Sequence, residues 1–200
     1  EQGGERMQVK KEEMRQTIHE IAADQFMKIG YENTPMRVIA QKANTTIGNI
    51  YHYFPNKEIL LEAIVLPVLE DVEAMIQWHV HEYGSRPFTR EEASIYAQHL
   101  EELFEESGIA CLFDRRVVIL LKLESSRLLP RKEAILEELQ KHLQDHYQMK
   151  DDAHYARLVL DVMVDCLKHV LTEHENMEDA KAEFLKLFRL FCTGILGQLN

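Results

Sequence analysis

The chain has 200 residues, 46% hydrophobic and 28% charged, which excludes a disordered or fibrous protein and gives enough length to bury a sizeable core. Its net charge of −11 argues at first sight against a nucleic-acid partner, but residues 1–57 carry +1 and the remainder carries −12. A near-neutral head on an acidic body remains compatible with DNA binding, provided that the basic groups of the head share one face.

The head is predicted to begin with a helix from about Lys10 to Ile29, because apolar side chains recur there at three- and four-residue steps. Gly30 then ends the helix, since glycine can adopt positive φ. Thr34 is expected to cap a second, short helix that has Pro35 at its first position. The buried stripe of this second helix is expected to be Met36, Ile39, Ala40 and Ala43.

A third helix is predicted after a tight turn at Asn44, because asparagine is one of the few residues besides glycine that tolerate a left-handed backbone. Thr45 or Thr46 is expected to cap it. Its inward-facing residues are expected to be Ile47, Ile50 and Phe54. Two short helices joined by a tight turn form a helix-turn-helix, whose second helix enters the major groove of DNA.

A long helical segment from Lys57 to Tyr83 follows, and Pro67 is expected to kink or split it. Pro67 as a pivot and Pro67 as an inert kink both remain open interpretations. Further helices are predicted at about 89–107, 110–128, 131–148, 152–175 and 177–198. The prediction is therefore an all-α protein: a three-helix N-terminal helix-turn-helix head at 8–57 and a helical C-terminal ligand-binding and dimerisation domain at 58–200.

The face of the third helix opposite its apolar side carries small and hydrogen-bonding residues. Gly48 lets the helix backbone approach DNA closely, and Asn49 can pair with an adenine edge, worth about 1–3 kcal/mol of discrimination. Hydroxyl groups and Lys57 suit phosphate oxygens. The predicted DNA-contacting residues are Arg37, Thr45, Thr46, Gly48, Asn49, Tyr51, His52 and Lys57.

The segment from Thr34 to Glu58 closely resembles the DNA-binding signature of the TetR family of bacterial transcriptional regulators. The most specific block is Ile50-Tyr51-His52-Tyr53-Phe54-Pro55-Asn56-Lys57-Glu58, and the resemblance covers residues 10 to 65. This sequence departs from the family pattern at Asn44, where glycine is usual, and at Thr45, where an apolar residue is usual. The resemblance implies repression rather than activation, and a dimer formed by a four-helix bundle of the last two helices from each subunit.

The last two predicted helices are apolar around so much of their circumference that they need partners on more than one side. They are either buried in their own domain or covered by a second copy, and the second copy is favoured because reading a palindrome by helix-turn-helix requires a twofold dimer. The expected interface residues are Val162, Cys166, Phe184, Phe188, Phe191 and Ile195.

An effector pocket is expected between the helices from about 89 to 175. Phe104, Phe113 and Met163 favour an apolar cavity, which suits a hydrophobic or amphipathic effector better than a sugar, although the same residues could equally fill a core. The candidate polar lining residues are Tyr96, His99, Arg116, Glu124 and Arg127.

Other classes of site are disfavoured by the residues. The three cysteines, Cys111, Cys166 and Cys192, are widely spaced and suit reduced, buried thiols in a cytoplasmic protein rather than a redox sensor. His142 and His146 lie four residues apart and could share a ligand, but no cysteine or carboxylate cluster completes a site, so neither a metal nor a cofactor is expected. No apolar run approaches the roughly 18 residues of a spanning helix, so no membrane partner is expected.

The leading hypothesis is a dimeric repressor that a small, hydrophobic effector releases from a palindromic operator in double-stranded DNA. A helical enzyme is disfavoured because no nucleophile has a nearby base and no glycine-rich phosphate loop is present. The remaining alternative is a helical protein-binding adaptor whose head does not read DNA sequence.

Overall fold

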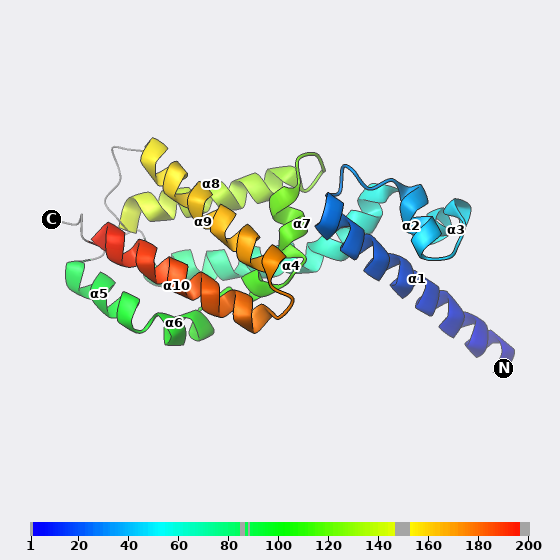
Figure 1. The fold of residues 1–200 in the computed structure, drawn as a ribbon, viewed down its shortest axis with the longest axis horizontal. Helices are drawn as coiled ribbons and strands as arrows, with labels where there is room; N and C mark the ends of the chain where they lie inside the picture. The colour runs from blue at the N-terminus through cyan, green and yellow to red at the C-terminus, as the bar shows by residue number, and fades with distance from the viewer. Residues whose placement is uncertain (1, 85–86, 88, 147–152, 197–200) are drawn as a thin grey trace.

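The computed structural model describes residues 2–84, 87, 89–146 and 153–196. Within these ranges every regular element is a helix, which confirms the all-α prediction. Three helices form the head: α1 (Gln2–Ile29), α2 (Met36–Lys42) and α3 (Ile47–Tyr53). The next helix, α4 (Lys57–Tyr83), runs from the head into the body (Figure 1).

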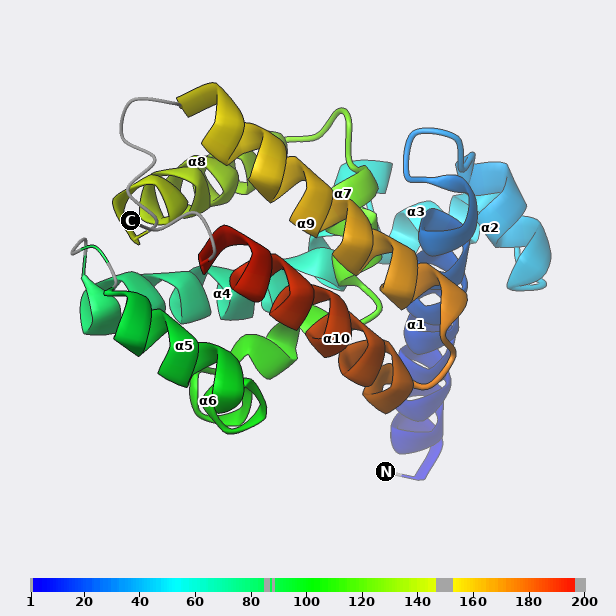
Figure 2. The same cartoon turned by 60° about the vertical axis from the view of Figure 1, so that its left-hand side comes forward.

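The body consists of shorter helices packed around the second half of α4. Its elements are α5 (Arg90–Gln98), α6 (Leu100–Glu106), the 3-10 helix η1 (Ile109–Phe113), α7 (Val117–Lys122), α8 (Leu129–His146), α9 (Ala153–Glu173) and α10 (Met177–Leu196). Helix α9 packs against both α8 and α10, and α10 also contacts α5 (Figures 1 and 2). Two helices predicted as continuous are therefore divided: 89–107 at His99, and 110–128 into η1 and α7.

The core of the head follows the predicted apolar stripes. Met36, Ile39, Ala40 and Ala43 of the second helix region are buried, as are Ile50 and Phe54, all as predicted. Gly30 has φ 86° at the end of α1, and Asn44 has φ 49° in the turn before α3, so both residues supply the backbone conformation expected of them.

Two local expectations for the head were wrong. Thr34 does not cap α2, because its hydroxyl donates back to the Gly30 carbonyl oxygen at 2.7 Å, and the residue preceding the helix is Pro35. Ile47 does not face inward, since 44% of its side chain is exposed. Ile47 lies about 60° around the axis from Ile50 in the first turn of α3, at the edge of the buried face.

Of the two outcomes expected at Pro67, a kink or a split, the split does not occur, because α4 continues through Pro67 as one helix. Proline has no N–H to offer the carbonyl four residues earlier, which belongs to Ala63. His19 of α1 supplies a replacement, because its Nε2 lies 3.2 Å from that carbonyl oxygen and can donate to it. A backbone acceptor released by proline thus joins α1 of the head to the long helix of the body.

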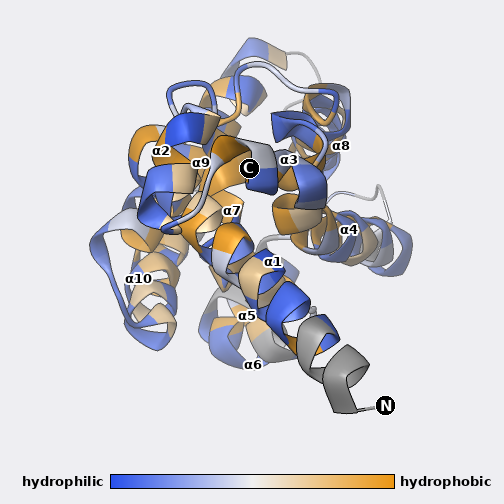
Figure 3. Cartoon of the chain, turned by 90° about the vertical axis from the view of Figure 1, so that its right-hand side faces the viewer, coloured by the Kyte–Doolittle hydropathy of each residue, from blue (hydrophilic) through white to orange (hydrophobic). Residues whose placement is uncertain are grey.

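A single cluster of buried hydrophobic residues extends from α1 through the first half of α4 into α7, α9 and α10. Hydrophilic and hydrophobic residues alternate along the helices, as expected of amphipathic helices with one buried face (Figure 3). In the described ranges, no helix is both long enough and apolar enough to cross a membrane.

Candidate functional site

The exposed face of α3 gathers most of the residues predicted to contact DNA. Helix α3 lies in the head, at the opposite end of the molecule from α5 (Figure 1). Thr46 caps the helix by accepting a hydrogen bond from the Asn49 backbone N–H at 3.1 Å, as predicted for one of the two threonines. Of the predicted residues, Thr46, Gly48, Tyr51 and His52 are exposed, as is Arg37 on α2, and Thr45 and Asn49 are half-buried.

Thr45 holds the side chain of Asn49 in a defined position. The Asn49 Nδ2 donates to the Thr45 Oγ1 at 2.8 Å. An amide has two N–H donors and one carbonyl oxygen, so this bond leaves one donor and the acceptor. Those two groups are what bidentate pairing with an adenine requires. Thr45, where the family usually has an apolar residue, therefore pre-orients the candidate base-reading side chain.

Gly48 has no structural reason to be glycine in the free protein. A Cβ built on it would meet only the Thr46 Oγ1, at 4.0 Å, and its φ lies outside the positive range. Glycine inside a helix is less stable than alanine by about 1 kcal/mol. The absence of a side chain is therefore best explained by the close approach of something outside the chain.

Replacing Gly48 by alanine is expected to change stability and DNA binding in opposite directions. We expect G48A to raise the free energy of unfolding by up to about 1 kcal/mol. Binding to the preferred DNA sequence should weaken by about tenfold or more, a loss comparable to one mismatched base pair. Urea denaturation and fluorescence anisotropy of labelled duplex measure the two quantities. If the variant is more stable but binds DNA with unchanged affinity, Gly48 is not needed for close approach of DNA to the α3 backbone.

Lys57 is engaged within the head. Its ammonium lies 4.3 Å from the centre of the Tyr31 ring and 3.4 Å from the Glu32 carbonyl oxygen. Burial lowers the pKa of Lys57, while the neighbouring Glu32 acts to raise it. An ammonium group has three donors, so this arrangement still leaves donors for a phosphate oxygen.

Ile47 is a candidate contact that the sequence reasoning missed, because periodicity assigned it to the core. Its exposed side chain lies four residues before Tyr51, on the same outward face of α3. An exposed apolar group on a helix that enters the major groove suits the methyl group of thymine.

The loop between α7 and α8 is hydrogen-bonded to the head. The Glu32 carboxylate accepts bonds from the backbone N–H groups of Glu124, at 3.0 Å, and Ser125, at 2.8 Å. The Glu58 carboxylate accepts from the Ser126 hydroxyl at 2.6 Å and the Arg127 backbone N–H at 2.8 Å. We refer to these contacts of Glu32 and Glu58 with residues 124–127 as the latch.

Both carboxylates of the latch are held in their charged form. Burial acts to raise the pKa of Glu32, but the hydrogen bonds that it accepts, chiefly from Ser125, outweigh burial and lower the pKa. Burial likewise acts to raise the pKa of Glu58, and the bonds from Ser126, Arg127 and Tyr31 together lower it. The latch is therefore fully formed at neutral pH and weakens in acid, as these carboxylates become protonated.

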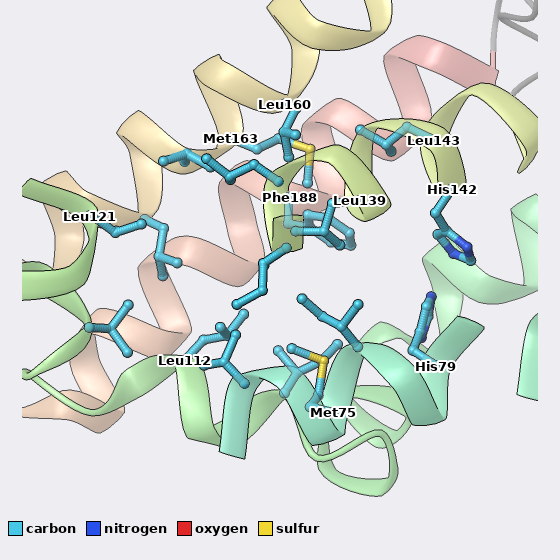
Figure 4. Close-up of a pocket in the computed structure, with 18 of the residues that line it drawn as sticks. Met75, His79, Leu112, Leu121, Leu139, His142, Leu143, Leu160, Met163 and Phe188 are labelled. Atoms are coloured by element: carbon cyan, nitrogen blue, oxygen red, sulfur yellow. The ribbon is translucent and has the colours of Figure 1, made fainter. Parts of the chain in front are cut away.

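The body encloses an apolar cavity of about 220 Å³ between α4, η1, α7, α8, α9 and α10. Leu112, Leu121, Leu139, Leu160 and Met163 project into it from different elements (Figure 4). Phe104, expected to favour an apolar pocket, also lines it. The helices α7 and α8, which flank the latch loop, both contribute to the cavity wall.

Four of the five polar residues predicted to line a pocket do not lie at this cavity. His99 is exposed and 3.2 Å from Glu102, and Arg116 pairs with Asp114 beside the Ile64 carbonyl oxygen. Glu124 and Arg127 belong to the latch loop. The side chain of Tyr96 lies outside the described residues. The polar lining instead comes from Lys132, His79, His142 and His146.

Of the three aromatic residues expected at a subunit interface, Phe184 is buried in the subunit itself, and Phe188 and Phe191 are half-buried. Phe184 is buried and packs against Phe104 and Phe113, so a second copy has no access to it. Phe188 and Phe191 line the cavity. The periodicity of the sequence identified this face of α10 as apolar, and in the structure the face packs against the body of the same subunit.

The exposed apolar surface of the last two helices lies elsewhere. On α9, Leu158 is 51% exposed and Val162, an expected interface residue, is 39% exposed; on α10, Leu190 is 69% exposed. Cys166 is half-buried. The side chain of Ile195 lies outside the described residues.

The described cysteine and histidine side chains give no separate reactive centre. Burial, with smaller contributions from Asp71 and Asp114, raises the pKa of the Cys111 thiol to about 11, which keeps it protonated and unreactive. The side chain of Cys192 lies outside the described residues. Within the described part of the chain, no group of three or more histidine, cysteine, aspartate or glutamate residues could hold a metal ion.

Comparison with known proteins identifies the head. Residues 18–64 match the family model described as bacterial regulatory proteins, tetR family. Over 56 residues the chain is 38% identical to YhgD, an uncharacterized HTH-type transcriptional regulator of Bacillus subtilis (strain 168). That match covers 28% of this chain and 29% of the relative, so it spans less than a third of either protein.

Similar solved structures include a transcriptional regulator from Aquifex aeolicus VF5, which is 20% identical. It overlaps 89% of this chain and 99% of its own, with a TM-score of 0.43. A putative TetR-family regulator from Mesorhizobium loti is 17% identical, with 94% and 96% coverage and the same TM-score of 0.43.

Proposed function

This chain belongs to the TetR family of bacterial regulatory proteins through its head, residues 18–64, and we propose that it is a dimeric repressor released from a palindromic operator by an apolar effector. The observation that carries the proposal is the outer face of α3, where Asn49 is pre-oriented by Thr45 beside the unobstructed backbone of Gly48. A helix that serves only packing has no use for either feature.

The cavity is the proposed effector site. Its wall is almost entirely aliphatic and aromatic, and its volume of about 220 Å³ lies somewhat below the 300–1,000 Å³ typical of drug-sized ligands. A small, elongated apolar molecule suits the cavity better than a sugar, because the hydroxyl groups of a sugar would find few hydrogen-bond partners there.

The latch is the proposed route from the cavity to the head. Helices α7 and α8 line the cavity, and the loop that joins them holds Glu32 and Glu58. A ligand that binds best when α7 and α8 have moved apart shifts the loop, and with it the orientation of α3. Because two recognition helices must lie about 34–36 Å apart to enter successive grooves, a small rotation of each head weakens operator binding.

Dimerisation is proposed to use the outward faces of α9 and α10. Leu158 and Val162 lie four residues apart and share one face of α9, and Leu190 adds exposed apolar surface on α10. These residues replace Phe184, Phe188 and Phe191, which face inward, as the expected interface.

Selection of random duplex DNA on the purified protein tests the proposal. We expect enrichment of a palindrome with half-site centres about one helical turn apart, from a sample shown to be dimeric by sedimentation. The selection must be run at fixed physiological salt with competitor DNA, because phosphate contacts make the affinity strongly salt-dependent. No enrichment from a folded dimer would favour a protein-binding adaptor whose head does not read DNA sequence.

A further inference from the structure

Three histidines gather at one end of the otherwise apolar cavity. The ring centres of His79, on α4, and His142, on α8, are 4.6 Å apart, and those of His142 and His146 are 3.9 Å apart. His79 and His142 face each other across the end of the cavity opposite Leu121 (Figure 4). His146 is almost fully buried.

The rest of the described cavity wall offers little that can titrate. Helices α6, α7, α9 and α10 and the 3-10 helix η1 contribute only apolar side chains, and α4 contributes none that titrates besides His79. The remaining charged group is Lys132, whose Nζ donates to the Leu123 carbonyl oxygen at 2.7 Å. Lys132 precedes His142 by ten residues, or about 15 Å along α8, so it lies away from the histidines.

His79 and His142 are neutral in the ligand-free protein at neutral pH. Burial, together with the neighbouring His146, lowers the pKa of His79 to about 4. Burial, together with His146 and His79, lowers the pKa of His142 to about 3. Leucine residues would fill an apolar wall without bringing polar atoms into it, so a ligand with a polar end gives a physical reason for three imidazoles at this place.

We propose that the cavity binds an elongated apolar carboxylic acid, with its hydrocarbon chain along α8 and its carboxyl group among His79, His142 and His146. This inference rests on the proposed function, since it takes the cavity to be the effector site. A neutral imidazole has one N–H donor and one nitrogen acceptor, which are the two groups that match a carboxyl group that brings a proton. An amine with the same chain would bring an unpaired cation into the apolar wall, which is unfavourable.

The proton balance follows from the burial. In solution near neutral pH the acid is a carboxylate, and His79 and His142 are neutral. A bare carboxylate in this cavity would be an unpaired buried charge, which is strongly unfavourable. Binding therefore takes up one proton, shared between the carboxyl group and an imidazole nitrogen. Because one proton is taken up on binding, the apparent affinity falls about tenfold for each pH unit between about pH 5 and 8.

Isothermal titration calorimetry of the full dimeric chain with octanoic acid, octanol and octylamine tests the inference. We expect octanoic acid to bind most tightly, with uptake of one proton per site, measured in buffers of different ionisation enthalpy. Its affinity should fall about a hundredfold between about pH 6 and 8. H142F should weaken octanoic acid at least tenfold and leave octanol unchanged. H142Q gives a second variant if the phenylalanine disturbs folding. H169F makes the same substitution at an exposed histidine of α9 that does not line the cavity, and it should bind octanoic acid like the wild type.

Equal binding of octanol and octanoic acid without proton uptake, preferred binding of octylamine, or binding of none of the three would each overturn the acid site. These results are separable from the proposed function, because palindrome selection depends on the head and not on any of these ligands. Conversely, if octanoic acid binds with proton uptake but no palindrome is selected, the proposed repressor function is wrong and the proposed acid site is still supported.

Discussion

Replacing Asn49 and Tyr51 together by alanine is expected to weaken binding to the selected palindrome by at least about thirtyfold. Each bidentate base contact contributes about 1–3 kcal/mol, and a twofold dimer loses the contact in both half-sites, for a total of about 2–6 kcal/mol. Tyr51 is 44% exposed, so its loss removes a contact to DNA rather than part of the core.

Stability should hardly change in this double variant. The N49A substitution removes the hydrogen bond to Thr45, worth about 1 kcal/mol, but replaces asparagine with a better helix former. Fluorescence anisotropy on the palindrome and on a scrambled duplex separates the loss of sequence reading from the loss of phosphate attraction. Q77A, at an exposed amide on α4, is the matched control and should bind like the wild type. Undiminished preference for the palindrome in the double variant would contradict base reading by α3.

The head could be predicted from the sequence because its determinants are local. The turn at Asn44, the cap at Thr46 and the buried pair Ile50 and Phe54 each depend on neighbours within a few residues. The predictions for Thr34 and Ile47 were wrong because each side chain has surroundings other than those expected. The Thr34 hydroxyl donates to the Gly30 carbonyl oxygen after α1 instead of capping α2. Ile47 lies in the first turn of α3, where its side chain is exposed to solvent.

The sites in the body could not be predicted in the same way. An apolar stripe shows that a side chain is buried but not against what, so Phe184 and Phe188 were assigned to a second subunit when they face the subunit's own interior. His79 and His142 are 63 residues apart and meet only because α4 and α8 pack together. Spacing along one helix could suggest His142 with His146, but not the third histidine or the apolar wall around them.

The latch could not be predicted from the sequence either, because it joins residues 68 to 93 positions apart. Most of its donors are backbone N–H groups, which nearly every residue possesses. If it transmits the effector signal, E32Q combined with E58Q should uncouple the two sites. Amides accept these bonds less strongly than carboxylates, and the free energy of unfolding should fall by about 1–3 kcal/mol. The factor by which effector weakens operator binding, typically about 5–150-fold in coupled systems, should fall toward one.

Operator affinity with and without effector, together with effector affinity in the absence of DNA, distinguishes uncoupling from general damage. The expected pattern is unchanged effector binding, because neither glutamate lines the cavity, with operator affinity that no longer responds to effector. E70Q removes an exposed carboxylate from α4 away from the latch and should keep the full response. A double variant that still releases the operator as the wild type does would show that the signal travels along α4 itself, through the contact of His19 with the carbonyl freed by Pro67. H19F would then be the variant that loses the response, since phenylalanine keeps the ring but cannot donate to Ala63.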